Sequence, residues 1–129
     1  MKPTSSLRVL VIDDDPDILL LCRLNLGYAG MDVLEARGGE EGIAASLVEL
    51  PDVIVLDLMM PQVDGIEVLR RLKAEPRTST IPVVVITAKV LGDDQDVTRA
   101  LGADIVMMKP FTMRELTTRV LTIARPRSK

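Results

Sequence analysis

The stretch VIVLDLMMP, residues 53–61, is a short apolar run that ends on an acid. Four residues that favour β-structure lead directly into Asp57, and Pro61 closes the stretch. An unpaired carboxylate is costly to bury, because its charge must leave water or its protonation must shift. We therefore expect Asp57 to lie where a strand emerges from a sheet. Its role there is either chemical or that of a turn former before Pro61.

Similar apolar runs alternate with amphipathic segments along the rest of the chain. Strands are predicted at 8–12, 31–36, 53–57, 81–87 and 103–108. Helices are predicted from about 16 to 28, from 38 to 50, after the turn at 61–65, from 93 to 101 and from 112 onward. This alternation predicts a doubly wound α/β fold with five parallel strands and helices on both faces. For five strands the common order is the flavodoxin-like 2-1-3-4-5.

Several local signals refine these elements. Asp15 before Pro16 predicts the N-cap of the first helix, and Thr112 with Glu115 predicts a capping box at the last. The helix at 38–50 is expected to bury one apolar face. That face comprises Ile43, Leu47 and Leu50 with Ala44 and Val48. Methionines 59, 60, 107 and 108 are expected to fill the core.

The 129 residues, of which 47% are apolar, suit one domain over 1–129. Its ordered core is expected at about 7–125, with 126–129 as a tail or the start of a linker. The sequence has neither a leader pattern nor an apolar run long enough to cross a membrane, so we expect a cytoplasmic protein without a membrane partner. Cys22, the lone cysteine, is expected to be a small buried hydrophobe.

Two absences narrow the possible functions. The chain has no histidine, which excludes histidine-based catalysis and histidine-ligated zinc. Tyr28 and Phe111 are the only aromatic residues, and the net charge is −3. A base-stacking platform and a basic face are therefore missing, and direct nucleic-acid binding is not expected.

Polar residues gather after the predicted strands. Asp13 and Asp14 follow the first strand, Asp57 ends the third, Thr87 ends the fourth and Lys109 follows the fifth. The carboxyl ends of parallel strands meet at one edge, so these side chains are expected to share a pocket. The clustered carboxylates repel one another and suit a hard divalent cation, Mg²⁺ or Mn²⁺. Such a pocket can stabilise a transferring phosphoryl group, with Asp57 as the best-placed nucleophile.

At this point the sequence resembles the response-regulator receiver domains of two-component signalling, over nearly its whole length. The motifs that carry the resemblance occur in the family's order and spacing. They are VIDDDP at 11–16, DLMMP at 57–61 with Asp64-Gly65, Thr87-Ala88, and Gly102-Ala103-Asp104 leading to Lys109-Pro110-Phe111. Each motif alone is weak, and the set is specific.

The resemblance implies that Asp57 accepts a phosphoryl group from the phosphohistidine of a sensor histidine kinase or phosphotransfer protein. It also implies that Mg²⁺ is held by Asp13, Asp14, Asp57 and the backbone carbonyl of Met59. Lys109 would pair with the phosphoryl oxygens, and Thr87 would move toward them as the switch residue. The domain would catalyse only its own phosphorylation and dephosphorylation. It would then signal to a downstream protein through the fourth helix, fifth strand and fifth helix.

The sequence departs from the family at Val106, where the family has an aromatic ring three residues before the lysine. We therefore expect a smaller or differently coupled change on that face. Met59 and Lys89, two residues after Asp57 and Thr87, are expected to flank the path of water to the acyl phosphate.

Three alternatives remain at this level. A Mg²⁺-dependent aspartyl-phosphate phosphohydrolase needs a second acid two residues after the nucleophile, where this chain has Met59. A degenerate receiver is disfavoured because the acids, Thr87 and Lys109 are all present. The chain is either a single-domain regulator, which binds a partner or relays phosphate onward, or a receiver taken from a longer regulator with an output domain.

Overall fold

The computed structural model describes residues 7–60, 65–87, 99 and 101–124. They form a five-stranded parallel sheet in the order β2-β1-β3-β4-β5. The strands are β1 (Arg8–Ile12), β2 (Asp32–Ala36), β3 (Val53–Asp57), β4 (Val83–Thr87) and β5 (Ile105–Met108). The predicted fold class and strand order are confirmed.

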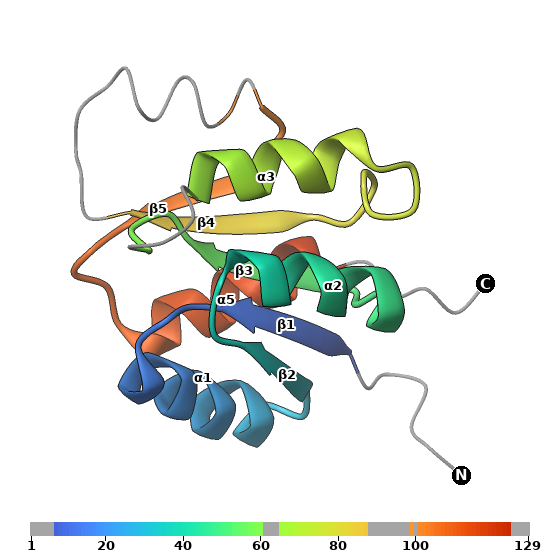
Figure 1. The fold of residues 1–129 in the computed structure, drawn as a ribbon. Helices are drawn as coiled ribbons and strands as arrows, with labels where there is room; N and C mark the ends of the chain where they lie inside the picture. The colour runs from blue at the N-terminus through green and yellow to red at the C-terminus, as the bar shows by residue number, and fades with distance from the viewer. Residues whose placement is uncertain (1–6, 61–64, 88–98, 100, 125–129) are drawn as a thin grey trace, which may run out of the picture.

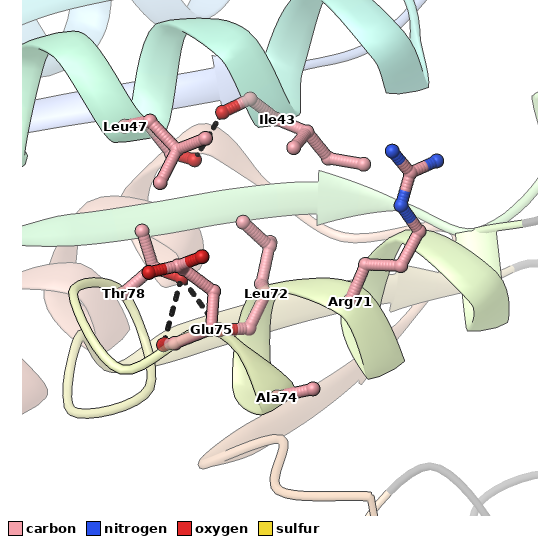
Figure 2. A pocket seen from close by; sticks show the side chains of 8 residues that line it. Ile43, Leu47, Arg71, Leu72, Ala74, Glu75 and Thr78 are labelled. Atoms are coloured by element: carbon pink, nitrogen blue, oxygen red, sulfur yellow. Dashed lines mark hydrogen bonds between the residues drawn. The ribbon is translucent and has the colours of Figure 1, made fainter.

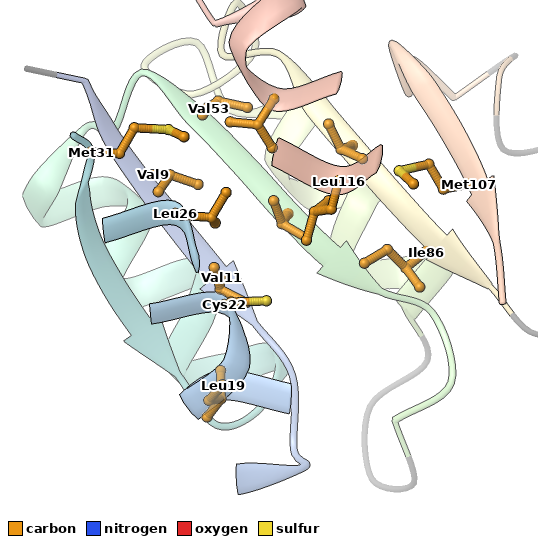
Figure 3. Close-up of a cluster of buried hydrophobic side chains, with 13 residues drawn as sticks. Val9, Val11, Leu19, Cys22, Leu26, Met31, Val53, Ile86, Met107 and Leu116 are labelled. Atoms are coloured by element: carbon orange, nitrogen blue, oxygen red, sulfur yellow. The ribbon is translucent and has the colours of Figure 1, made fainter. Parts of the chain in front are cut away.

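Helices cover both faces of the sheet (Figure 1). Helices α1 (Pro16–Tyr28) and α5 (Met113–Ile123) lie on one face, and α2 (Gly39–Glu49) and α3 (Gly65–Ala74) lie on the other. Each face has its own apolar core. Figure 3 shows the core on the α1 and α5 side, where Leu26 and Leu116 pack with Val9 and Val53 of the sheet.

Strand β3 lies near the middle of the sheet and is buried along its whole length. Val53 and Val55 belong to the core beside α1 and α5, whereas Ile54 and Leu56 belong to the core beside α2 and α3. Side chains of a strand alternate between its faces, so a strand with helices on both sides is apolar at every position. The continuous run that ends at Asp57 is therefore explained by this central position.

The predicted starts of the first and last helices are confirmed. The Asp15 carboxylate accepts a hydrogen bond of 2.9 Å from the backbone N–H of Asp17, which caps α1. At α5, Thr112 and Glu115 form the reciprocal capping box. Cys22 is fully buried, as expected, and burial raises the pKa of its thiol to about 12. The thiol is therefore protonated at neutral pH.

The predicted buried face of α2 is wrong. Val48 is 79% exposed and Ala44 is exposed, while Ile43, Leu47 and Leu50 are only half-buried. The residues that α2 buries are small: Gly39, Gly42 and Ser46. A Cβ at Gly42 would lie 2.6 Å from Cδ1 of Ile12, so the helix sits too close to β1 for a larger side chain.

Two of the four methionines expected in the core are not buried. Met60 and Met107 are each 7% exposed, as expected of core residues, but Met59 is 49% exposed and Met108 is 38% exposed. Strands β2, β4 and β5 also begin one or two residues later than predicted. Part of the turn predicted at 61–65 and most of the helix predicted at 93–101 lie outside the described residues. No helix in the described part is long and apolar enough to cross a membrane.

Candidate functional site

Three carboxylates meet where β1 and β3 end. The register pairs Ile12 with Leu56, so Asp13 and Asp57 leave neighbouring parallel strands at the same level. Oxygen atoms of Asp13, Asp14 and Asp57 all lie within 4.8 Å of one another. Asp13 and Asp57 are only 2% and 3% exposed, whereas Asp14 is exposed. The expected acidic cluster is therefore present at the carboxyl edge of the sheet.

Backbone N–H groups orient the two buried acids. The N–H of Asp15 donates to Oδ1 of Asp13 at 2.9 Å, and the N–H of Met59 donates to Oδ1 of Asp57 at 2.9 Å. In each case the donor lies two residues after the acid, where the chain turns away from its strand. Oδ2 of Asp57 is therefore the oxygen left to face the pocket.

A lysine faces that second oxygen. Nζ of Lys109 lies 3.6 Å from Oδ2 of Asp57, and the lysine side chain is 35% exposed. The backbone N–H of Lys109 donates to the carbonyl of Thr87 at 2.9 Å, which continues the β4–β5 pairing beyond the last strand residue. Thr87 is itself 4% exposed. Thr87 and Lys109 thus lie at the same edge as the acids, as predicted.

Asp13 is an acid of this cluster with a clearly shifted pKa. Burial raises the pKa of the Asp13 carboxyl from 3.8 to about 7, and the nearby Asp57 carboxylate adds to the rise. The Asp15 N–H and the Lys109 ammonium act in the opposite direction and only partly offset it. A raised carboxyl pKa means that the folded protein binds a proton more tightly than the unfolded chain. Stability is therefore lost as the pH rises from about 4 to about 7.

Replacing Asp13 by Asn is expected to stabilise the metal-free protein. At pH 8 the free energy of unfolding should rise by about 1–3 kcal/mol, because the variant removes a buried, repelled charge and keeps the oxygen that accepts from Asp15. The gain should disappear below about pH 4, where the unfolded chain is protonated as well. Urea unfolding followed by circular dichroism in EDTA measures both values. Equal stabilities at pH 8 would show that the charge of Asp13 carries no cost.

The donor set fits a hard divalent cation. Carboxylate oxygens are the ligands that Mg²⁺ and Mn²⁺ prefer, and three of them converge here. The pKa of Asp13 is raised by burial of its charge and then by the nearby Asp57 carboxylate, and a bound cation would offset both effects. Asp13, Asp14 and Asp57 are therefore the described residues that could hold such an ion, together with the backbone that follows Asp57.

The structure describes two of the remaining predicted positions, Met59 and Val106. Met59 lies two residues after Asp57 on the loop and is half exposed. Val106 pairs with Val85 in the middle of β5, two residues before Met108 at the strand end, and is half-buried. Lys89 is outside the described residues. Sequence reasoning assigned no role to Gly65, although a Cβ at this position would lie 2.4 Å from Cα of Leu58. Its place in the Asp64-Gly65 motif was the available signal.

A concave feature that contains none of the acidic-site residues lies beside α2 and α3. It is a groove of about 340 Å³ between α2 and α3, with Leu47 and Leu72 among its walls (Figure 2). Its two hydroxyls are turned toward the backbone: Ser46 donates to the carbonyl of Ile43 at 2.7 Å, and Thr78 donates to that of Leu72 at 2.6 Å. These groups stabilise helix and loop structure and offer no reactive chemistry.

Comparisons of the sequence and the structure with known proteins indicate the same class of domain as the motifs at this site. The sequence matches the response regulator receiver domain family over residues 9–121. This match covers most of the chain, and the protein therefore belongs to that family. The receiver domain of a Francisella response regulator is similar in structure, with a TM-score of 0.85 and 31% identity over 92% of this chain and 96% of that one. Chemotaxis protein CheY4 of Vibrio cholerae gives a TM-score of 0.86 at 25% identity, over 92% of this chain and 99% of that one.

The chain is also similar to receiver-containing transcriptional regulators. It is 45% identical to the DNA-binding dual master transcriptional regulator RpaA of Synechocystis, over 92% of this chain and 49% of the relative. It is 42% identical to the alkaline phosphatase synthesis transcriptional regulatory protein PhoP of Bacillus subtilis, over 92% of this chain and 48% of that protein. The chain thus spans about half the length of these relatives.

Proposed function

We propose that this domain is a phospho-accepting switch in which Asp57 is the phosphoacceptor. The observation that carries the proposal is the environment of Asp57. This buried carboxylate has Oδ1 fixed by the Met59 N–H and Oδ2 facing the Lys109 ammonium, beside two further acids. A carboxylate oriented in this way can act as a nucleophile, with a fixed positive charge at hand for the incoming group.

A divalent cation completes the proposed site. Asp13, Asp14 and Asp57 would hold Mg²⁺, or Mn²⁺ in its place, with the backbone carbonyl of Met59 as a further ligand. When bound, the ion would neutralise charge on the phosphoryl oxygens. The exposed position of Asp14 suits a ligand that faces solvent and an ion that keeps several waters.

The chain's own residues account for the remaining chemistry. A carboxylate oxygen of Asp57 attacks the phosphorus of a phosphohistidine on the donor. The P–N bond breaks, the histidine leaves, and Asp57 becomes an acyl phosphate. The ammonium of Lys109 pairs with the phosphoryl oxygens, and the hydroxyl of Thr87 bonds to them from the end of β4. These 129 residues contain no histidine, so the phosphohistidine would come from outside them. A sensor histidine kinase or a histidine phosphotransfer protein is the proposed donor.

The proposed output is a change of the surface around β5 and α5. Strand β5 ends directly before Lys109 and pairs with β4 up to Thr87, and α5 begins shortly after Lys109. In a single-domain protein this surface would bind a downstream protein. In a longer regulator, like the transcriptional regulators above, it would control an attached output unit, and contact with DNA would belong to that unit. A cytoplasmic location is part of this proposal. The phosphohydrolase alternative is disfavoured because Met59 stands where such an enzyme needs an acid.

Metal-dependent labelling tests the proposal. The wild-type protein incubated with a small phosphodonor, such as acetyl phosphate, should gain the mass of one phosphoryl group in the presence of Mg²⁺ and none in EDTA. Intact-mass spectrometry measures the gain. Labelling that is equally fast with and without Mg²⁺ would contradict the proposed role of the acidic cluster.

A further inference from the structure

Gly65, the first residue of α3, lies against the backbone of the residue that follows Asp57. A Cβ added at Gly65 would lie 2.4 Å from Cα of Leu58, 2.9 Å from its carbonyl oxygen and 2.9 Å from its Cδ2. Two of these three atoms belong to the backbone and cannot rotate away. Any side chain at position 65 would therefore displace either the start of α3 or the backbone at Leu58.

Leu58 is held from its other side as well. Its N–H donates to the carbonyl of Ile86 at 2.9 Å, which extends the β3–β4 pairing one residue beyond Asp57. The backbone of Leu58 therefore lies between β4 and the first turn of α3. The next residue, Met59, supplies the N–H that fixes Oδ1 of Asp57. A shift of Leu58 is transmitted through one peptide unit to that donor.

We propose that Gly65 is a positioning residue for the acidic site. Because Gly65 has no side chain, α3 can pack directly against the backbone of Leu58. This contact keeps the Met59 N–H directed at Asp57 and holds the Met59 carbonyl at the acidic site. The inference rests on the proposed function in one respect, since the carbonyl is a proposed metal ligand. The hydrogen bond from Met59 to Asp57 exists without metal and gives an independent measure.

Helix propensity alone predicts the opposite effect of a substitution. Alanine is more favourable than glycine within a helix, so Gly65→Ala would be neutral or stabilising if position 65 were open. A harmful effect of Gly65→Ala would therefore result from the close contact with Leu58 and not from helix propensity. Gly27→Ala provides the control, because Gly27 is also a helical glycine, in α1, but its added Cβ would meet nothing within 4 Å.

The test compares the two variants with the wild type in two measurements. The first is the hydrogen exchange of the Met59 amide in metal-free protein, and the second is the dissociation constant for Mg²⁺ from amide-shift titration. For Gly65→Ala we expect exchange to be at least about tenfold faster and Mg²⁺ binding to be about 10- to 100-fold weaker, the range for residues that support metal ligands. For Gly27→Ala both values should stay within about twofold of the wild type.

Wild-type exchange and wild-type Mg²⁺ affinity in Gly65→Ala would overturn the proposal, as would equal losses in Gly27→Ala. If Gly65→Ala alone does not fold, the double variant with Leu58→Ala is measured in its place. That variant removes the Cδ2 contact and keeps both backbone contacts, so the same losses are expected, and full recovery would overturn the proposal. Failure of the proposed function looks different, because Asp57→Asn would then be phosphorylated normally whatever residue 65 is.

Discussion

The Asp57→Asn variant is expected to gain no phosphoryl group from a small phosphodonor under conditions that label the wild type fully. Asparagine keeps the Oδ1 that accepts from Met59 and has nearly the same shape, but its amide is not a nucleophile and carries no charge for Lys109. Intact mass after incubation with Mg²⁺ measures the loss. The substitution also removes one of the repelling acids, so the variant should fold at least as stably as the wild type.

Asp52→Asn is the control for this experiment. Asp52 immediately precedes the same strand, β3, and at 6% exposed it is nearly as buried as Asp57. Its carboxylate accepts a hydrogen bond of 2.8 Å from the N–H of Arg8 at the opposite end of the sheet. This variant should be labelled as fully as the wild type. Loss of labelling in both variants would point to a general effect on folding, and retention in both would remove Asp57 as the acceptor.

Lys109→Ala is expected to slow phosphorylation by about 100-fold or more, which corresponds to about 3 kcal/mol of lost transition-state stabilisation. The lysine ammonium is the cation that the described site directs at Oδ2 of Asp57, at 3.6 Å. Its removal leaves the charge on the transferring group to be balanced by the metal alone. The initial rate of mass gain at fixed Mg²⁺ and phosphodonor concentrations measures the effect.

Lys109→Arg separates charge from geometry. Arginine keeps the positive charge, but its planar guanidinium is larger and directs its donors differently, so we expect a rate between those of alanine and lysine. Thermal unfolding followed by circular dichroism should show that both variants are folded at the assay temperature. A rate within about threefold of the wild type for Lys109→Ala would show that the ion pair with Asp57 is structural and not catalytic.

The parts of the fold that depend on neighbouring residues were predictable from the sequence. The caps at Asp15 and Thr112 involve residues at most three positions apart. Apolar strands and the regular alternation with helices were sufficient for the parallel sheet, and the order followed from the most common arrangement of five such strands. The buried face of α2 was not predictable in this way, because it depends on how closely Gly42 approaches Ile12 of a different strand.

The grouping of the candidate site residues at one edge could be predicted from the sequence, but their interactions could not. The carboxyl ends of parallel strands share an edge, which brings Asp13, Asp57, Thr87 and Lys109 together once the strand order is known. Which oxygen of Asp57 faces the lysine depends on the loop backbone at Met59. The raised pKa of Asp13 likewise depends on burial, which spacing along the chain does not reveal.

The exposure of Met59 illustrates the same limit. Its apolar side chain and its place after a buried strand indicated a core residue, yet nearly half of its surface is exposed. The chain turns outward at this residue because its N–H bonds back to Asp57. A local backbone interaction at the candidate site therefore outweighs the hydrophobic preference of one side chain.

The central claim, that Asp57 is the phosphoacceptor, is tested most directly by identifying the residue that carries the phosphoryl group. Borohydride reduces an acyl phosphate on aspartate to homoserine and leaves free carboxylates unchanged, so peptide mass mapping after labelling and reduction identifies the acceptor. We expect homoserine at position 57 in phosphorylated protein and at no other acid, with none in protein kept in EDTA. Homoserine at position 13 or 14, or phosphate that survives reduction on another residue, would contradict the assignment of Asp57 as the phosphoacceptor.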